Sequence, residues 1–317
     1  MNKLSRRSFI FTLASSAGFA AIAVPLSLAS PACAGGTELL VCSFGGNSVT
    51  RYDLATGAYL GALDPAANIQ GPLCARLGPD GLLYVASEGN NKVVRYNPGT
   101  WTFKDAFITG NGLTQPTGLT WDKNGDLLVS SFDGDSVLKF DGSTGAPKGT
   151  LVTSGQGTLN GADNGTTIGP DGALWVPSYW NNRVLRYDGT TGATLGQFAA
   201  VGRPRVMEFR GTTMFITSET NNSVRKYDIA TGQYLGNFVA SGSGGLTTPI
   251  GMAFTTDILY VTSSNNKVLK YDAISGAFLG QFTSDHLNLP TFLTVVPSPA
   301  AGAVAPIAAL VLTRRRV

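Results

Sequence analysis

The residues best suited to binding chemistry follow a serine that recurs six times along the chain. The position directly after this serine holds an aromatic residue three times, a glutamate twice and a serine once. Aromatic faces beside carboxylates and an arginine suit a sugar or a peptide. The alternative is an ordinary solvated loop surface. The predicted ligand-binding residues are Glu88, Phe132, Asp133, Tyr179, Trp180, Arg205 and Glu219.

The sequence does not supply a catalytic set around these residues. A serine nucleophile needs an adjacent base, and His286, next to Asp285, is the only histidine. These two residues are either an acid–base pair or an isolated surface pair. The histidine and cysteine content gives no zinc signature, and no phosphate-binding glycine-rich loop is evident. Glu88, Asp133 and Glu219 could approximate a Ca²⁺ set. We predict no catalytic residue and no cofactor, with Ca²⁺ as the alternative.

The distribution of charge argues against a nucleic-acid partner. The formal charge is +3, but six basic residues lie near the two ends, namely Lys3, Arg6, Arg7 and residues 314–316. The remaining 17 basic residues stand against 20 acidic ones. A body with a net charge of −3 lacks the basic surface that nucleic acids require. A charged content of only 14%, with 40 glycines among 317 residues, favours short strands and tight turns over helices.

A repeated segment positions the predicted binding residues. Its aromatic residues are separated by 44, 44, 47, 40 and 44 residues, a period typical of propeller blades. We expect the serines to bond the backbone of the following turn. The Asn or Asp residues should bond their own backbone and tolerate left-handed conformations, and the basic residues should pair with an Asp two positions later. The four columns are Ser43, Ser87, Ser131, Ser178, Ser218, Ser263; Asn47, Asn91, Asp135, Asn182, Asn222, Asn266; Arg51, Arg95, Lys139, Arg186, Lys226, Lys270; and Tyr52, Tyr96, Phe140, Tyr187, Tyr227, Tyr271.

Each repeat provides four strand candidates, which predicts an all-β, six-bladed β-propeller of four-stranded antiparallel blades. In one repeat the strands are expected over 115–121, 127–131, 136–140 and 146–152, with an Asn-Gly turn after the first. First strands should lie innermost, which explains a column of small residues at Cys74, Gly118, Gly165 and Gly251. Val206 and Phe292 interrupt the column and should narrow the channel.

The register predicts how the ring closes. The body begins with a second strand at 38–43 and ends with an unpaired first strand at 289–295. The C-terminal strand should therefore complete the N-terminal blade and remove the open edges. We divide the chain into an export signal (1–34), the propeller (35–297) and a C-terminal sorting or anchor segment (298–317).

The two end segments predict an exported protein. A basic start, an apolar run from Phe9 to about Leu28 and a small-x-small site ending at Ala34 form an export signal. Residues 5–10 resemble the bacterial twin-arginine signal, with an ordinary secretory signal as the alternative. Residues 297–317 resemble the PEP-CTERM sorting tail, in which Ser298 replaces the usual glutamate. The resemblance implies an export translocase and a sorting protease as partners, and a place in the cell envelope, at the cell surface or outside the cell.

The repeat itself, Val-x-Ser-x-x-Asn-Asn-Lys/Arg-Val-x-x-Tyr-Asp followed by Thr-Gly and later Pro-x-Gly-Leu, resembles the NHL-repeat propellers over about residues 38–297. It is also similar to the six-bladed group that includes gluconolactonase-like and streptogramin-lyase-like enzymes. The lyase resemblance would require two histidines, which this chain lacks. The lactonase resemblance would require a converging Glu, Asn and Asp metal site. NHL repeats usually have Asp at the serine column, so the inter-blade hydrogen bonds should differ.

These observations predict a protein that binds a polysaccharide, a matrix component or another protein through its loop face. The alternatives are a metal-dependent hydrolase or lactonase and a structural matrix protein without a discrete site. The longest connection between repeats, 153–165, is either a lid over the mouth or a mobile loop. Cys42 and Cys74 are expected to be separate buried residues, with a disulfide as the alternative.

Overall fold

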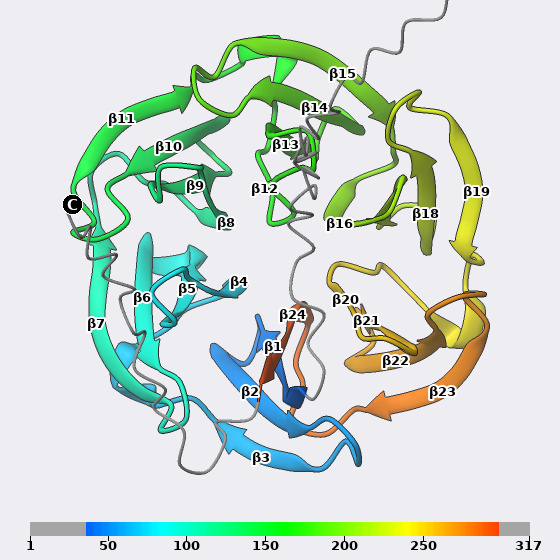
Figure 1. The fold of residues 1–317 in the computed structure, drawn as a ribbon. Coiled ribbons are helices and arrows are strands. Elements are labelled where there is room, and N and C mark those ends of the chain that lie inside the picture. The colour runs from blue at the N-terminus through cyan, green and yellow to red at the C-terminus, as the bar shows by residue number, and fades with distance from the viewer. Residues whose placement is uncertain (1–35, 298–317) are drawn as a thin grey trace, which may run out of the picture. The chain divides into compact units, whose positions relative to one another are not determined.

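The computed structural model describes residues 36–297, and the predicted signal and tail segments lie outside them. The described chain forms six four-stranded antiparallel sheets around one axis, with the first strand of each sheet innermost (Figure 1). This architecture confirms the predicted six-bladed propeller. Among the described residues, no helix is long and apolar enough to cross a membrane.

The strands of each blade are given from the inside outward. Blade one is β24 (Pro290–Pro297), β1 (Gly36–Ser43), β2 (Ser48–Asp53) and β3 (Tyr59–Ala62), and blade two is β4 (Pro72–Leu77), β5 (Leu83–Ser87), β6 (Lys92–Asn97) and β7 (Thr102–Thr109). Blade three is β8 (Pro116–Trp121), β9 (Leu127–Ser131), β10 (Ser136–Phe140) and β11 (Pro147–Val152), and blade four is β12 (Thr167–Ile168), β13 (Ala173–Ser178), β14 (Arg183–Asp188) and β15 (Thr194–Ala200). Blade five is β16 (Pro204–Arg210), β17 (Thr213–Ser218), β18 (Ser223–Asp228) and β19 (Tyr234–Val239), and blade six is β20 (Met252–Phe254), β21 (Ile258–Ser263), β22 (Lys267–Asp272) and β23 (Phe278–Thr283). Four short 3₁₀ helices are η1 (Pro65–Ala67), η2 (Glu88–Asn90), η3 (Gln156–Thr158) and η4 (Ser243–Gly245).

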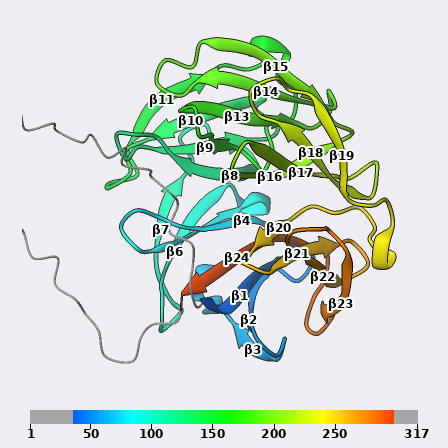
Figure 2. The same cartoon turned by 45° about the vertical axis from the view of Figure 1, so that its right-hand side comes forward.

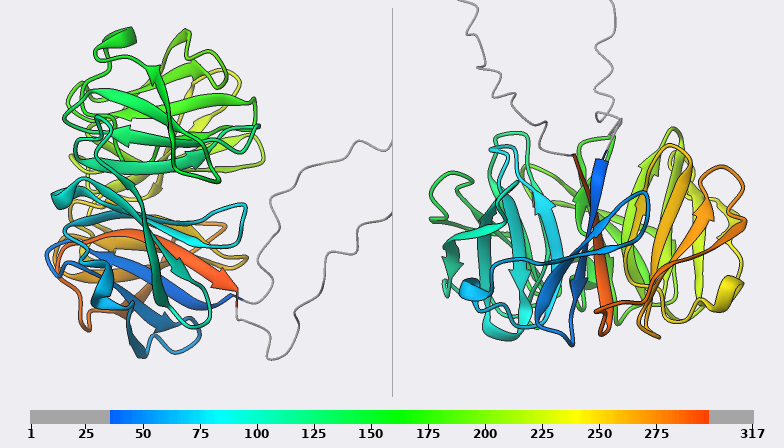
Figure 3. Two further views of the ribbon diagram at one scale, coloured as in Figure 1. Left: turned by 90° about the vertical axis from the view of Figure 1, so that its left-hand side faces the viewer. Right: turned by 90° about the horizontal axis from the view of Figure 1, so that it is seen from below.

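The ring closes as the sequence predicts. The last strand, β24, pairs antiparallel with the first, β1, in a register that sets Leu39 opposite Val295 and Val41 opposite Leu293. Figures 2 and 3 show the orange-red β24 lying beside the blue β1. The inner strand of blade one therefore comes from the opposite end of the described chain.

The aromatic column connects each blade to the chain segment that enters it. Tyr52, Tyr96, Tyr187 and Tyr271 are fully buried between blades. Their hydroxyls donate to backbone carbonyls of the preceding connection, as from Tyr187 to Gln156 at 2.7 Å. Phe140 has no hydroxyl for this bond. Each third strand thus contributes apolar area and, in five blades, one backbone contact.

The serine column bonds a different partner from the one predicted. Each serine hydroxyl donates to a backbone carbonyl of the segment that enters its own blade, and not to the backbone of the following turn. Ser218, for example, donates to the Gly202 carbonyl at 2.8 Å. The backbone of the following turn is already satisfied by its own bonds, so the hydroxyl bonds the carbonyls of the entering segment, four of which also accept a backbone N–H. All six serines form this bond to Asn288, Gln70, Thr114, Asn160, Gly202 and Thr247, in chain order.

The Asn/Asp column connects successive blades. All six residues adopt the left-handed conformation, as predicted, with φ between 47° and 63°. Their side-chain oxygens, however, accept from the backbone N–H that opens the next blade, and not from their own turn. We call this contact the clasp. The six N–H donors are Gly71, Gln115, Gly161, Arg203, Thr248 and Leu289, and each of these residues also has a positive φ.

The clasp that reaches the closing strand can be tested at Asn266. Replacing Asn266 with Ala removes the acceptor for the Leu289 N–H and places a Cβ-bearing residue without a polar side chain at φ 63°. We expect a loss of about 2 kcal/mol from the hydrogen bond and the conformational cost together. Asn266→Gly keeps the conformation and should lose about 1 kcal/mol. Asn266→Asp keeps the acceptor, as Asp135 does naturally, and should unfold in urea like the wild type. Equal losses for the Ala and Asp variants would contradict the clasp.

The basic column also pairs differently from the prediction. The aspartates two positions later cap the following turn, as Asp228 does by accepting from the Thr231 N–H at 2.8 Å. Among the described residues, four of the six basic side chains pair with other acids instead, such as Arg51 with Glu38 at 2.9 Å. A local turn satisfies the aspartate oxygens first, and the basic side chains extend across neighbouring strands of the same blade.

The innermost strands approach one another closely. A Cβ at Gly251 would collide with the Thr291 carbonyl, and a Cβ at Gly165 with the Arg205 carbonyl, so glycine is required at both positions. Val206 and Phe292 are buried in the same core. Counted from the clasp, however, Asn164 and not Gly165 is the equivalent of Cys74 in blade four, because Asn164 and Cys74 each lie three residues after their clasp donor.

Cys42 and Cys74 are free and fully buried in this core. Their separation as thiols confirms the preferred interpretation of the sequence. Burial raises the pKa of both thiols, and for Cys42 the neighbouring Cys74 adds to the effect. Both groups are therefore neutral small hydrophobic residues in the folded protein.

Candidate functional site

The residues after the serine column all lie at one end of the propeller, which we call the mouth. In each blade the backbone N–H of that residue donates to the segment that enters the blade, as from Glu88 to Gly71 at 3.2 Å and from Glu219 to Arg203 at 3.2 Å. The loops between second and third strands and the connections between blades therefore share this end. The same arrangement holds the predicted site residues close to the propeller axis.

Three predicted aromatic residues form one cluster at the mouth. The ring centroid of Tyr179 lies 4.7 Å from that of Trp180 and 5.8 Å from that of Phe132. Gly161 lies beneath them, where a Cβ would come within 2.9 Å of Trp180 and 3.1 Å of Phe132. Tyr179 is buried, whereas Trp180 is 53% exposed. We call Phe132, Tyr179 and Trp180 the aromatic cluster. Phe132 and Tyr179 hold the indole of Trp180 in place, and about half of that side chain is exposed to solvent.

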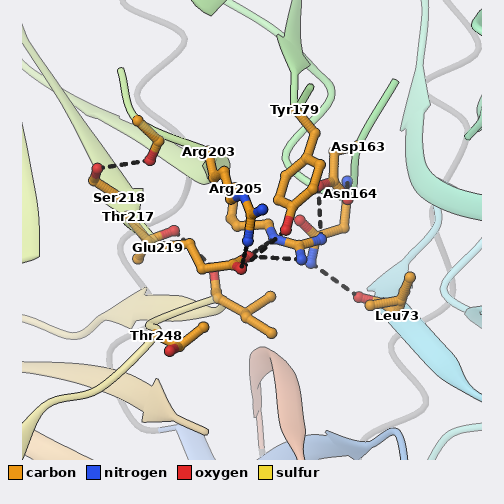
Figure 4. Close-up of polar contacts among 12 residues, drawn as sticks. Leu73, Asp163, Asn164, Tyr179, Arg203, Arg205, Thr217, Ser218, Glu219 and Thr248 are labelled. Carbon is orange, nitrogen blue, oxygen red and sulfur yellow. Dashed lines mark hydrogen bonds and ion pairs between the residues drawn. The ribbon is translucent and has the colours of Figure 1, made fainter. Parts of the chain in front are cut away.

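Arg205 connects this cluster to two buried carboxylates. Its guanidinium donates to Glu219 Oε2 and to Asp163 Oδ2, each at 2.7 Å (Figure 4). It also lies 4.1 Å from the centre of the Tyr179 ring. Tyr179 Oη donates to Glu219 Oε1 at 2.9 Å. A charge-assisted network of this kind fixes all four side chains relative to one another.

The network places strongly desolvated charges in contact. Burial alone would lower the pKa of Arg205, but Asp163 and Glu219 more than offset it and raise the pKa above its ordinary range. Burial raises the pKa of Asp163, and Arg205 counteracts part of that effect. Burial also raises the pKa of Tyr179, which remains a donor at neutral pH. Arg205 therefore remains charged and pairs with both Asp163 and Glu219.

Asp163 and Asn164 were not among the predicted site residues. The segment 153–165, predicted as a lid or a mobile loop, has a buried second half that enters the axis. Asn164 Nδ2 donates to the Leu73 carbonyl at 3.3 Å, and Asn164 Oδ1 has no partner within the described residues. A signal was present: Asp163 and Arg205 each lie two residues after a clasp donor, so they occupy equivalent positions in adjacent blades.

Beside the aromatic cluster lies a shallow cavity of about 590 Å³, which we call the mouth depression. Arg203 connects the two features, because its guanidinium lies 5.7 Å from the Trp180 ring centre and also lines the cavity. Arg203 Nη1 pairs with Glu219 Oε1 at 3.3 Å, so the lining carries no net charge. The lining residues are Asn182, Arg203, Glu219, Thr220, Asn222 and Thr248.

The two remaining predicted residues, Glu88 and Asp133, line a second cavity of about 390 Å³, which we call the acidic pocket. Asp133 follows Phe132 directly, so one loop separates the acidic pocket from the aromatic cluster. Neither carboxylate has a salt-bridge partner in the described part of the chain, in contrast to Glu219. The lining residues are Phe44, Glu88, Gly89, Asn91, Thr114, Gln115 and Asp133.

Glu88 titrates near neutrality in this pocket. Burial, then the negative charge of Asp163, raises its pKa from 4.5 to about 7. Arg205 acts in the opposite direction and Asp133 adds to the increase. The charge at the mouth therefore changes within the physiological pH range.

The raised pKa predicts a pH-dependent effect of Glu88→Gln on stability. Because the folded pKa lies above the ordinary value, Glu88 stabilises the fold fully below pH 4.5 and loses this contribution as the pH rises through about 7. The variant should match the wild type at pH 4.5 and exceed it by about 1 kcal/mol at pH 8, a value already reduced for solvent screening. Urea unfolding at both pH values measures the difference. A gain of equal size at both values would contradict the assignment.

The predicted carboxylates do not converge on one point in the described structure. Among residues 36–297, no three His, Cys, Asp or Glu side chains are grouped so that they could hold a metal ion. Glu219 is bound by Arg205 and Arg203, while Glu88 and Asp133 face a different cavity. His286 lies 3.6 Å from Asp285 and stacks on Tyr59 of β3 at 3.8 Å, with its side chain 55% exposed.

Comparisons with known proteins support the fold. No family model matches the chain, and no curated protein matches it. A chain in the crystal structure of a nidogen/laminin complex superposes with a TM-score of 0.65 at 18% identity, and covers 83% of this chain and 99% of that one. At this identity the likeness shows a shared propeller fold and nothing finer. The site must therefore be interpreted from its own residues.

Proposed function

We propose that this protein is exported and binds a ligand through its mouth, at the cell envelope or outside the cell. The observation that supports binding is the half-exposed Trp180, fixed by Tyr179 and Phe132 beside the mouth depression. A large aromatic surface that is held rigidly, next to a concave polar surface, loses little conformational entropy when a partner binds. We propose an export translocase and a sorting protease as further partners, and this part of the proposal depends only on the sequence of the two end segments.

Binding of another protein is one form that this recognition can take. The similar chain in the nidogen/laminin structure belongs to a protein–protein complex, which is compatible with binding by this fold. Because the ion network around Arg205 is satisfied internally, we assign it a positioning role, and we assign the contact with ligand to Trp180 and Arg203. The wild-type fold therefore presents a preformed site.

The proposal is tested by replacing Trp180 in the full-length protein. Purified wild type and Trp180→Ala are compared on surfaces that carry immobilised glycans and peptides. We expect at least a tenfold loss of the bound signal, because a central aromatic contact contributes about 2 kcal/mol or more. Tyr234→Ala removes a side chain that is 43% exposed on the outermost strand of blade five and should bind like the wild type. Equal binding by both variants would locate the ligand site elsewhere.

A further inference from the structure

The mouth depression combines three features that are seldom found together on a solvated loop surface. All six lining residues have side chains that can form hydrogen bonds, and their formal charges cancel in the Arg203–Glu219 pair. The half-exposed indole of Trp180 stands at its edge, connected by Arg203. An apolar ring face beside uncharged donors and acceptors complements a pyranose, which has an apolar C–H face and a rim of hydroxyls.

The hydrogen-bonding groups of the depression are oriented before any ligand arrives. Asn182 Oδ1 accepts from the Arg203 N–H and Asn222 Oδ1 accepts from the Thr248 N–H, at 2.8 and 2.7 Å. These clasps fix both amides, so each Nδ2 group is held as a donor and makes no hydrogen bond to other described residues. The hydroxyl of Thr248 is likewise uncommitted within the described region. Fixed donors reduce the entropy lost on binding.

The charges around the depression select against acidic ligands. Four carboxylates, Glu88, Asp133, Asp163 and Glu219, surround the mouth, while Arg203 and Arg205 are the cations of the same network. Both arginines are already paired with carboxylates, while Asp133 and the partly ionised Glu88 have no cationic partner among the described residues, so this region repels uronate or sulfate groups. A neutral ligand avoids that repulsion and can use the donors of the depression.

From these features we infer that the mouth depression and the exposed face of Trp180 form a subsite for an uncharged carbohydrate chain. The ring of one sugar stacks on Trp180, and hydroxyls of the same or the next sugar accept from Asn182 and Asn222. Arg203, already paired with Glu219, donates to a hydroxyl or ring oxygen. This inference rests on the proposed function and specifies its ligand class.

The chain supplies a matched set of variants for the test. Asn222→Asp preserves the oxygen that receives the Thr248 N–H but replaces the free Nδ2 donor with an acceptor, and Asp135 shows that aspartate fits this column. Asn47→Asp makes the same change at an equivalent clasp that lines neither the depression nor the acidic pocket. Trp180→Phe retains a smaller aromatic face for comparison with Trp180→Ala.

The experiment measures binding of the full-length protein to immobilised hexasaccharides of glucose, mannose and galactose, to oligogalacturonate, and to a random peptide library. We expect at least one neutral hexasaccharide to bind. Trp180→Ala should weaken this binding about tenfold or more, Trp180→Phe less, and Asn222→Asp about fivefold. Asn47→Asp should bind like the wild type, and thermal midpoints should be equal for both Asp variants.

Each other outcome overturns the inference. Binding of peptides that depends on Trp180, without binding of any neutral sugar, refutes the carbohydrate subsite while the proposed function stands. Stronger binding of oligogalacturonate than of every neutral sugar also refutes it. Loss of sugar binding in Asn47→Asp equal to that in Asn222→Asp would show that the clasp, and not the free donor, matters. Absence of any Trp180-dependent binding refutes both the inference and the proposed function.

Discussion

Deleting residues 290–317 is expected to abolish the folded propeller. The deletion removes β24, so β1 loses the antiparallel partner of its inner edge and blade one keeps only three strands. Phe292 and Leu293 leave the core, and the close contact between Gly251 and Thr291 disappears. The combined loss of core side chains and a strand ladder exceeds the 5–15 kcal/mol by which a domain is typically stable.

The matched control deletes residues 298–317 and leaves β24 intact. We expect this shorter deletion to give a sharp thermal transition and the circular dichroism of a β protein, while the longer one gives neither and aggregates through the exposed edge of β1. Adding a synthetic peptide of residues 290–297 to the longer deletion should restore part of the fold. A cooperative transition in the longer deletion without the peptide would show that the ring does not depend on its closing strand.

The secondary structure could be predicted from sequence because its signals are local. In blade three the observed strands β9 and β10 have the predicted bounds, and β8 and β11 each begin one residue later than expected. Turn residues, alternating burial and the 44-residue period act within a few residues of each strand end. Closure was predictable for the same reason, since counting strands left one partner missing at each end.

The partners of the hydrogen bonds that connect the blades could not be predicted from the sequence. Asn222 was correctly expected to be left-handed, because that preference belongs to the residue itself. Its acceptor role toward Thr248 depends on how neighbouring blades lie, and no local pattern specifies that. The serines were likewise expected to bond backbone groups, as they do, but those of the following turn instead of the entering segment. The residue type determines which hydrogen-bonding groups a side chain has, whereas the packing of neighbouring blades determines which groups they bond.

The site shows the same division between residue type and contact. Glu88 and Asp133 face a separate pocket. The other five predicted residues are in contact with one another, namely Phe132, Tyr179, Trp180, Arg205 and Glu219. Glu88 and Glu219 occupy the same column, yet only Glu219 forms salt bridges with arginines. The arginines belong to the entry of blade five, whereas the entry of blade two has Gly71 and Leu73 at the equivalent positions. The difference between the glutamates therefore comes from neighbouring columns.

Arg205→Met is expected to destabilise the protein by about 3–5 kcal/mol at pH 8, because it leaves the buried Asp163 without a cation and Glu219 with only the more exposed Arg203. Asp163 is fully buried and Glu219 nearly so. Burial already raises the pKa of Asp163, and Arg205 is the largest influence that lowers it. Removing Arg205 raises this pKa further, so the stability deficit is largest at high pH and shrinks as the pH falls and Asp163 takes up a proton. Guanidinium unfolding from pH 4.5 to 8 should therefore show a deficit that increases with pH.

Two further variants separate charge from packing. The triple variant Asp163→Asn, Arg205→Met, Glu219→Gln removes all three charges with little change in volume and should recover most of the loss, with no remaining pH dependence at this site. Arg186→Met breaks the ion pair between Arg186 and Asp171, whose two side chains are 31% and 32% exposed, respectively. This variant should lower the free energy of unfolding by about 1 kcal/mol or less at every pH. If Arg205→Met costs the same at pH 4.5 as at pH 8, the loss comes from packing against Tyr179, and the mouth does not depend on an ion network. Because the same network fixes Tyr179 beside Trp180, a deficit that follows the titration of Asp163 should be accompanied by weaker ligand binding at the mouth.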